Sequence, residues 1–416
     1  MKATPRDPSF TIEPRSLTER SSTINTFDQL GLQPALLRAV HDLKFTEPTP
    51  IQIMSIPPAL AGRDVLASAE TGSGKSAAFG LPILNKLIDL PRGKTRALIL
   101  APTRELAEQI ATHLSALAKH TTIRVAAVYG GVGFGPQATA FKRGSDVIVA
   151  TPGRLLDHIE RGTAKLNDVS MLVLDEADRM LDMGFLPAVR RIVRFVSPKR
   201  QTFFFSATLP PMISGLIREM LHDPARVELA AKASPVAGLT QTVYAVPNEK
   251  KTDLFLELLK DNTIYSAIAF TRTKARANRL AAALEKHRIP SDLIHGDRSQ
   301  SQRTRALENF KRGKHRVLVA TDIAARGIDI LELGHVVNYD VPRAAEDYVH
   351  RIGRTARAKS TGDAITFVSS DEEPLMKQIE YLLGKRLDRS KNPLFPEASI
   401  EPPKARVVYR SRPRRR

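Results

Sequence analysis

The sequence contains no cysteine and no tryptophan, and aromatic residues make up only 6% of its 416 positions. Without cysteine, disulfides and thiolate metal sites are excluded, and the chain suits a reducing compartment, so we expect a cytoplasmic location. No apolar run approaches the roughly 18 residues of a membrane-spanning helix, so we expect no membrane partner. The few aromatic rings also provide few platforms on which bases could stack.

The N-terminus, residues 1–24, lacks the apolar stretch of a secretory signal. Asp7, Glu13 and Glu19 argue against a transit peptide, because such peptides contain few acidic residues. We predict a loose N-terminal extension over residues 1–24.

Positive charge is in excess: 63 Lys and Arg against 44 Asp and Glu give a net charge of +19. Residues 401–416 contribute +6 of this charge and the rest of the chain +13. The excess favours a polyanionic partner such as nucleic acid, although a well-solvated surface can have the same composition. We predict that the basic C-terminal end adds non-specific affinity for nucleic-acid phosphates.

The length suits two domains of roughly 150 to 200 residues each. Short runs rich in Val, Ile and Leu alternate with segments of helical period, which is typical of mostly parallel sheets covered by helices on both faces. Residues 231–248 contain Pro and Gly and have no long helical period, so we place a linker there. The predicted α/β domains span residues 25–230 and 249–372, and a basic, flexible tail follows over 373–416.

The predicted strands of the first half each end in a polar motif, and ligands of open α/β sheets bind at the carboxyl ends of the strands. VIVAT at 147–151 and VLVAT at 317–321 indicate that the two halves share one architecture. The predicted strands lie within residues 64–69, 96–103, 124–131, 146–154, 171–178 and 202–208, and then 266–273, 292–297, 316–322, 335–340 and 364–370.

The stretch SAETGSGKS at 68–76 predicts a phosphate-binding loop. Gly72 and Gly74 can take positive φ and expose backbone N–H groups to an anion, and the helix predicted to follow favours negative charge at its N-terminus. Lys75 would reach the β- and γ-phosphates, and Ser76 would bind Mg²⁺. Alanine replaces the first glycine of the generic loop, and an ordinary Gly-rich connector is the structural alternative. The predicted nucleotide-binding loop comprises Ser68, Ala69, Glu70, Thr71, Gly72, Ser73, Gly74, Lys75 and Ser76.

A second nucleotide signal is MLVL followed by DEAD at 171–178. A buried strand that ends in adjacent carboxylates can place Asp175 in the Mg²⁺ shell and Glu176 beside the attacking water, as NTP hydrolysis requires. Acidic residues at an exposed helix start are the structural alternative. Because the tetrad follows an apolar strand and lies downstream of a phosphate-binding loop, the catalytic interpretation is favoured.

The motifs AETGSGKS, PTRELA, TPGR, DEAD and SAT, followed by HGDRSQSQR, ATDIAARGID and YVHRIGRTARA, resemble those of the DEAD-box RNA helicases in order and spacing. The resemblance runs from about Phe27 to about Ser370, and TFDQLGL and DEADRMLDMGF most resemble the bacterial RhlE branch. It implies two tandem RecA-like domains, ATP and Mg²⁺ as cofactors, and domain closure coupled to local, non-processive RNA unwinding. Single-stranded RNA and short duplexes would bind independently of sequence, and ribosomal or RNA-decay components are candidate partners.

The resemblance also assigns residues to the nucleotide base and ribose. Gln52 in FTEPTPIQ would read adenine, because a Gln amide can pair with both N7 and the 6-amino group. Phe27 and Phe45 would either pack near the base or belong to the core. Asp329 would contact the ribose, and Lys44 stands where the family usually has Gly.

For catalysis, the resemblance assigns Lys75, Glu176 and two arginines of the second domain, Arg354 and Arg357, which would reach the γ-phosphate. Ala356 and Lys359 replace glycines that are common around Arg357 in the family, and we expect the chemistry to survive because both arginines are present. The resemblance assigns the metal to Ser76 and Asp175, partly through water, coupling to Ser206, Thr208, Asp178, His350 and Arg351, and RNA backbone contacts to Thr103, Arg104, Gly131, Thr151, Arg154, Arg272, Gln300, Arg303 and Thr321.

Two other functions would use the same motifs. One is an RNA clamp or assembly factor, in which ATP times residence on RNA and unwinding is incidental. It predicts slow hydrolysis with long-lived, ATP-dependent RNA retention. The other is a nucleic-acid-stimulated ATPase that acts on DNA, which competition between matched RNA and DNA strands would reveal.

Overall fold

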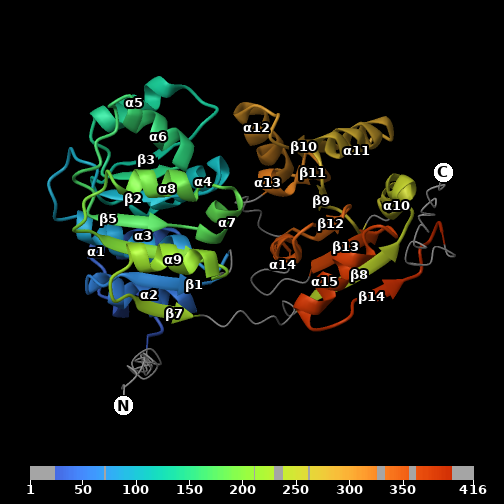
Figure 1. The fold of residues 1–416 in the computed structure, drawn as a ribbon, viewed down its shortest axis with the longest axis horizontal. Helices are drawn as coiled ribbons and strands as arrows, with labels where there is room; N and C mark the ends of the chain where they lie inside the picture. Colours follow the sequence, from blue (N-terminus) through green and yellow to red (C-terminus); the bar gives the residue numbers. More distant parts are fainter. Residues whose placement is uncertain are drawn as a thin grey trace, which may run out of the picture.

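The computed structural model describes residues 24–69, 72–209, 211–228, 238–260, 263–325, 333–355 and 362–395. In this part of the chain, the strands form two sheets of seven strands each. All the pairings within the two sheets are parallel. Figure 1 shows the sheets in two separate lobes, one from the first half of the sequence and one from the second. The predicted α/β class with two tandem sheets is confirmed.

The two sheets share one arrangement of strands. Their orders are β3-β4-β2-β5-β6-β1-β7 and β10-β11-β9-β12-β13-β8-β14. The strands that carry the similar pentapeptides, β4 and β11, both lie second from an edge, which agrees with the shared architecture inferred from the sequence. The strand bounds are β1 (Val65–Ser68), β2 (Ala97–Leu100), β3 (Val125–Val128), β4 (Val147–Ala150), β5 (Met171–Leu174), β6 (Gln201–Ser206), β7 (Ala225–Glu228), β8 (Leu239–Ala245), β9 (Ala267–Thr271), β10 (Ser291–Ile294), β11 (Val317–Thr321), β12 (His335–Asn338), β13 (Gly362–Val368) and β14 (Asp388–Ser390).

Helices cover both faces of the first sheet, because successive side chains of a strand point to opposite sides. Val65 and Ala67 of β1 pack into one apolar cluster, and Leu66 packs into another on the opposite face. The first cluster includes side chains of α1 to α4, and the second includes side chains of α6 to α9. The helices are η3 (Phe27–Leu30), α1 (Pro34–Asp42), α2 (Pro50–Leu60), α3 (Lys75–Leu87), α4 (Arg104–Leu117), α5 (Phe134–Lys142), α6 (Pro152–Glu160), α7 (Ala177–Asp182), α8 (Leu186–Val193) and α9 (Pro211–Met220).

The second sheet is covered in the same way. Ala267 and Ala269 of β9 pack with α10 and α11, whereas Ile268 and Phe270 pack with α12 and α13. Among the described residues, no helix combines the length and apolarity needed to cross a membrane. The helices are η4 (Asn248–Lys250), α10 (Lys251–Leu258), α11 (Lys274–Lys286), α12 (Gln300–Lys311), α13 (Asp322–Ala325), α14 (Ala345–Ile352) and α15 (Glu373–Leu383).

Two predicted boundaries of the second domain are corrected by the structure. Strand β8 lies inside the predicted linker 231–248 and pairs with both β13 and β14. Helix α15 and strand β14 lie inside the predicted tail 373–416, and Met376 and Ile379 of α15 are buried against α14. Strands β8 and β14 were missed because outer strands are short and only partly buried. The helical character of the sequence after residue 371 was recognised, but its packing against the domain was not. Residues 1–23, 229–237 and 396–416 lie outside the described residues.

Candidate functional site between the domains

The carboxyl end of β1 leads into the predicted phosphate-binding loop. Gly72 and Gly74 have φ angles of 88° and 94°, in the region that favours glycine. Lys75 begins α3 and is only 6% exposed, and its Nζ donates a hydrogen bond to the Ala69 carbonyl oxygen at 2.9 Å. The lysine therefore folds back over the loop. Ser68, Ser73 and Ser76 also belong to its described part, whereas Glu70 and Thr71 lie outside the described residues.

Gln52, the predicted adenine-reading residue, joins α2 to this loop. Its Nε2 donates to the Gly74 carbonyl oxygen at 3.1 Å, and its Oε1 accepts from the Thr49 N–H at 2.9 Å, which caps α2. A Cβ added to Gly74 would lie 2.6 Å from Gln52 Nε2. Gly74 is therefore required both by its φ angle and by the close approach of Gln52.

The two predicted base-packing rings occupy different environments. Phe27 is 4% exposed and belongs to the core of the first domain. It stacks on the half-buried Phe45 with ring centroids 6.3 Å apart, and Phe45 contacts His113 edge to face. Lys44 has a φ of 56°, a left-handed conformation that costs a residue with a Cβ about 1 kcal/mol. A glycine at this position would adopt it without this cost.

Asp175 and Glu176 follow β5 and are almost fully buried. Burial raises the pKa of Asp175 to about 6, although Lys75 opposes the shift. Burial alone would also raise the pKa of Glu176, but Arg179, followed by Lys75 and Arg354, outweighs it, so this pKa is lowered. Glu176 has φ 52° and ψ 52°, a strained left-handed conformation at the start of α7.

Arg179 was missed by the sequence analysis. It directly follows the DEAD tetrad, is 3% exposed, and its Nη1 lies 3.4 Å from Glu176 Oε2, three residues away on α7. The helical spacing of these two residues is the signal that could have identified it.

Hydrogen bonds to Asp178 connect the end of β6 to α7. Its Oδ2 accepts hydrogen bonds from the Ala207 N–H at 3.0 Å, the Thr208 N–H at 2.9 Å and the Thr208 Oγ1 at 3.1 Å. Ser206 Oγ accepts from the Asp178 N–H at 3.2 Å and donates to the Thr208 carbonyl oxygen at 2.6 Å. The structure therefore brings the three predicted coupling residues of the first domain together.

The donor set of this site suits Mg²⁺. The Ser76 hydroxyl and the Asp175 carboxylate line one cavity. Burial raises the pKa of Asp175 despite the nearby Lys75, so a dication would add counter-charge that this buried carboxylate needs to be ionised. No group of three or more His, Cys, Asp or Glu that could hold a metal occurs in the described part of the chain. Few protein ligands, completed by phosphates and water, are typical of Mg²⁺.

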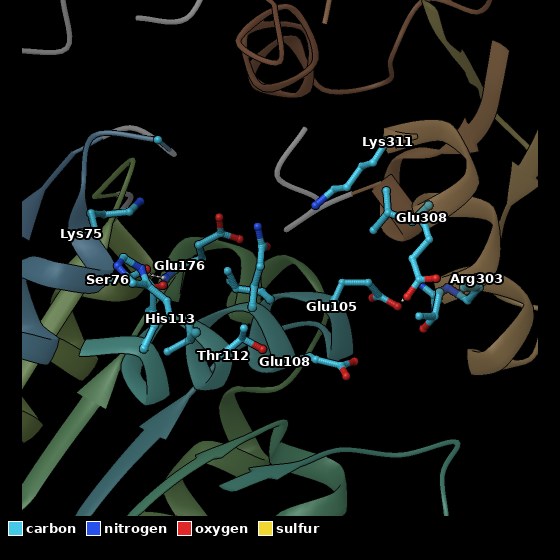
Figure 2. Close-up of a pocket in the computed structure, with 18 of the residues that line it drawn as sticks. Lys75, Ser76, Glu105, Glu108, Thr112, His113, Glu176, Arg303, Glu308 and Lys311 are labelled. Carbon is cyan, nitrogen blue, oxygen red and sulfur yellow. Dashed lines mark hydrogen bonds and ion pairs between the residues drawn. The ribbon is translucent and has the colours of Figure 1, made fainter. Parts of the chain in front are cut away.

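The cavity has a volume of about 740 Å³ and lies between the two domains. Figure 2 shows Lys75, Ser76 and Glu176 on one side and Lys311 of α12 on the other. Arg354, which is 5% exposed, extends from the second domain to the same cavity.

A smaller pocket beside this cavity is lined by Arg179 and by His350 of α14. Burial, followed by Arg179, lowers the pKa of His350 to about 3, so its imidazole is neutral near pH 7. Arg357 and Asp329, the other residues predicted to reach the nucleotide from the second domain, lie outside the described residues.

A direct contact between the domains joins α4 and α12. Glu105 Oε1 accepts a hydrogen bond from Gln300 Nε2 at 3.1 Å. It also forms an ion pair with Arg303 Nη2 at 2.9 Å (Figure 2). Gln300 and Arg303 were predicted to contact RNA, and the structure places them at this contact. Glu105 is a functional candidate that sequence reasoning missed, because PTRELA reveals its position but not a partner 195 residues away.

The predicted RNA contacts of the first domain follow β2, β3 and β4. A Cβ added to Gly131, whose φ is 83°, would overlap the Arg104 guanidinium, so this arginine lies directly against the glycine. Arg154 Nη2 donates to the Val132 carbonyl oxygen at 2.8 Å, on the same loop. Thr103 and Thr151 are the N-cap residues of α4 and α6, and the Thr103 hydroxyl accepts from the Leu106 N–H.

Two predicted residues of the second domain have partners inside that domain. Arg272 forms an ion pair with Glu372. Arg351 is 2% exposed and binds Asp322 through two hydrogen bonds, at 2.6 and 2.8 Å. Arg351 therefore fixes α14 to α13, although it also lines the small pocket beside Arg179. Thr321 ends β11 and is nearly buried.

Comparisons with known proteins agree with this geometry. A family model described as DEAD/DEAH box helicase matches residues 49–214, and one described as Helicase conserved C-terminal domain matches residues 250–359. The DEAD-box ATP-dependent RNA helicase CshA of Bacillus subtilis is 43% identical over 373 residues, which are 90% of this chain and 75% of that protein. The ATP-dependent rRNA helicase RRP3 of Candida glabrata is 44% identical over 373 residues, 89% of this chain and 76% of that protein.

Among solved structures, S. cerevisiae Dbp5 bound to RNA and ADP BeF3 superposes with a TM-score of 0.80 at 32% identity, covering 88% of this chain and 95% of that one. A Dbp5 variant bound to Nup159, a Gle1 variant, IP6 and ADP gives a TM-score of 0.61 at 31% identity, and the superposition covers 86% of this chain and 95% of that one. The predicted RecA-like tandem fold is confirmed by the first likeness. The chain belongs to the DEAD-box ATP-dependent RNA helicases.

Proposed function

We propose that this helicase hydrolyses ATP only when its two domains close on each other, and that RNA promotes this closure. One observation carries the proposal: Arg354 of the second domain lines the same cavity as Lys75 and Glu176 of the first. A charge that stabilises the transition state is thus supplied by the domain that does not hold the phosphate-binding loop. Separation of the domains would remove it.

In the closed arrangement, each residue has a role that its environment favours. Lys75 neutralises the β- and γ-phosphates once they displace its bond to the Ala69 carbonyl. Glu176, whose pKa is lowered, stays ionised and orients or deprotonates the attacking water. Arg354 stabilises charge that develops on the γ-phosphate, and Arg357 has the same proposed role.

Ser76 and Asp175 would hold Mg²⁺, partly through water, and the ion would neutralise charge on the β- and γ-oxygens. Phe45 and Gln52 are the proposed contacts of adenine, and Asp329 is the proposed contact of the ribose. If the base accepts the Gln52 amide hydrogens, they must be released from Gly74, which links base binding to the shape of the loop.

RNA would lie across the carboxyl ends of both sheets. Main-chain N–H groups near Gly131 and the guanidinium groups of Arg104, Arg154 and Arg272 suit phosphates, and such contacts carry little sequence information. The Asp178 contacts with Ser206 and Thr208 would transmit hydrolysis to the RNA side. Closure that bends one strand would then dislodge its partner locally, without translocation.

Several finer assignments remain predictions. A relation to the RhlE branch rests on TFDQLGL and DEADRMLDMGF, whereas the relatives reported above are CshA and RRP3. A cytoplasmic location and ribosomal or RNA-decay partners are also proposals.

Steady-state ATP hydrolysis, measured with no nucleic acid, with single-stranded RNA and with the matched DNA strand, tests the proposed function. We expect strong stimulation by RNA and little by DNA, because 2′-hydroxyl contacts distinguish the two. Glu176→Gln should lower the stimulated rate by about 100-fold or more. Hydrolysis that is indifferent to RNA, or equally stimulated by DNA, would contradict the proposal. Slow hydrolysis with long-lived RNA retention would favour the clamp instead.

A further inference from the structure

The second domain contains a lysine that is completely buried. Lys251, the first residue of α10, is 0% exposed, and its Nζ forms ion pairs with Asp340 Oδ1 at 3.3 Å and with Glu372 Oε2 at 2.5 Å. Both carboxylates are themselves at most 3% exposed. Burial of charged groups is costly unless they are paired and hydrogen-bonded, so this arrangement requires both acids.

Glu372 uses both of its oxygens. Oε2 accepts hydrogen bonds from Lys251 Nζ and from the Ser369 N–H and hydroxyl. Oε1 accepts from the Val341 N–H and from Arg272 Nη2. The carboxylate therefore connects α10, the segment after β13 and the segment after β12 to a single arginine.

The Arg272 guanidinium is hydrogen-bonded to the protein along one edge only, among the described residues. Its main-chain N–H donates to Asp340 Oδ2 at 2.8 Å, and its Nη2 is shared between Glu372 and the Val341 carbonyl oxygen. Its side chain is 27% exposed, and its Nη1 makes no hydrogen bond among the described residues. The guanidinium thus has a fixed edge toward the protein and another edge available for a phosphate oxygen, for which its planar donor geometry is suited.

Arg276 and Asp371 complete the network. Arg276 Nη2 forms a further ion pair with Asp340 Oδ1 at 2.8 Å. The Ser369 hydroxyl donates to Asp371 Oδ1 at 2.6 Å, and this hydrogen bond, together with the nearby charges of Lys251 and Arg272, lowers the pKa of Asp371. The two arginines are 27% and 21% exposed, whereas the lysine is buried, so the arginines are the cations of the network that a phosphate can reach.

We propose that Glu372 is a positioning residue for RNA binding, which acts by holding the Arg272 guanidinium in place and does not itself touch RNA. The proposal rests on the proposed function, in which Arg272 contacts an RNA phosphate. Lys251 compensates the charge of the buried Glu372 carboxylate through their ion pair. The alternative is that the network only stabilises the second domain.

The first test measures RNA-stimulated ATP hydrolysis by the full-length chain with a single-stranded RNA oligonucleotide. Glu372→Gln keeps the shape of the side chain and removes its charge. We expect KM for RNA to rise about tenfold, because a hydrogen bond between charged groups is lost. The value of kcat at saturating RNA and KM for ATP should change by less than about twofold, because Glu372 does not line the nucleotide cavity.

A double variant separates positioning from stability. Glu372→Gln alone leaves Lys251 buried with one fewer counter-charge and should lower the unfolding temperature. Lys251→Met combined with Glu372→Gln removes this imbalance, so the unfolding temperature should recover while KM for RNA stays raised. Recovery of KM together with stability would overturn the proposal.

A cycle with Arg272→Ala tests whether Glu372 acts through the arginine. Arg272→Ala should raise KM for RNA, and adding Glu372→Gln should raise it no further. A further rise in the double variant would overturn the positioning role. If Arg272→Ala raises KM but Glu372→Gln alone does not, the positioning proposal fails and the RNA contact stands. If Arg272→Ala leaves KM unchanged, the RNA contact fails, and the positioning proposal fails with it.

Discussion

Glu105 of α4 and Arg303 of α12 form an ion pair at 2.9 Å between the two domains, and each side chain is only 9% exposed. Removal of one partner from a buried pair leaves the other charge without compensation, which costs about 3–5 kcal/mol. When the domains separate, both groups regain water. The pair therefore makes the closed arrangement sensitive to either residue without requiring that either one touch RNA or ATP.

We expect Glu105→Gln to weaken closure by leaving Arg303 without its counter-charge. RNA-stimulated kcat/KM should therefore fall by about tenfold or more. Glu160→Gln is a matched control, because it removes an exposed ion pair, with Arg191 at 2.7 Å, inside the first domain. An equal loss in both variants would show that the contact between the domains is not the cause.

Gly74→Ala should weaken ATP binding. The added Cβ would meet Gln52 Nε2 at 2.6 Å and Thr49 Oγ1 at 2.8 Å, and alanine is strained at a φ of 94°. We expect the Kd of a fluorescent ATP analogue to rise about tenfold or more, since about 1.4 kcal/mol corresponds to tenfold.

Gly62→Ala is the control for Gly74→Ala. Gly62 has a φ of 82°, and a Cβ there would meet no atom within 4 Å. Stability should fall by roughly 1 kcal/mol, whereas the Kd for the analogue should stay at its wild-type value. A similar rise of Kd in both variants would mean that backbone strain alone, without the contact to Gln52, weakens nucleotide binding.

Arg354→Ala should lower kcat for RNA-stimulated hydrolysis by about 1,000-fold, because the charge that stabilises the γ-phosphate in the transition state is lost. Arg343→Ala removes an exposed arginine from the same domain and should have little effect. Single-turnover hydrolysis at saturating ATP and RNA measures the chemical step directly. A loss confined to KM for RNA would contradict the catalytic role of Arg354.

Stability should depend on pH through His158. This side chain is 0% exposed and stacks on the Phe134 ring, with the ring centroids 3.9 Å apart. Burial, followed by the charge of Arg154, lowers the pKa of His158 to about 4. The unfolded chain therefore binds a proton on this residue between about pH 6.5 and pH 4 when the folded chain does not. Stability contributed by the neutral imidazole is complete above this window and is lost as pH falls through it.

Urea unfolding of the wild type and of His158→Asn, measured between pH 7 and pH 4.5, isolates this contribution. The free energy of unfolding should fall more steeply with decreasing pH in the wild type, by at most about 1.4 kcal/mol per pH unit. Parallel pH profiles would exclude His158 as the cause, whatever the absolute stabilities.

Central strands could be predicted from the sequence because they are buried on both faces and consist of continuous apolar runs. Strand β7 was missed because its side chains alternate between buried and exposed. Strand β8 was interpreted as linker, and β14 contains only Asp, Arg and Ser. Such outer strands are defined by pairing with a neighbour and not by their own composition.

The gathering of Lys75, Ser76 and Asp175 around one cavity could be predicted, because these residues lie in short motifs at strand ends whose local geometry depends on nearby residues. The distant residues that contact these motifs could not be predicted from the sequence. Glu105 contacts a residue 195 positions away, and Lys251 pairs with Glu372 across 121 positions. Glutamates and lysines are common on any surface, so neither pair is distinguishable in one sequence from solvated charges.

In the proposed mechanism, ATP and RNA together close the domains. The distance between two dyes, attached at Lys142→Cys on α5 and Lys286→Cys on α11, tests it most directly, because both positions are exposed and the chain has no native cysteine. We predict efficient energy transfer only when a non-hydrolysable ATP analogue and single-stranded RNA are both present, and a reduced closed fraction in Glu105→Gln. Equal transfer without ligands, or full closure with the analogue alone, would contradict the account.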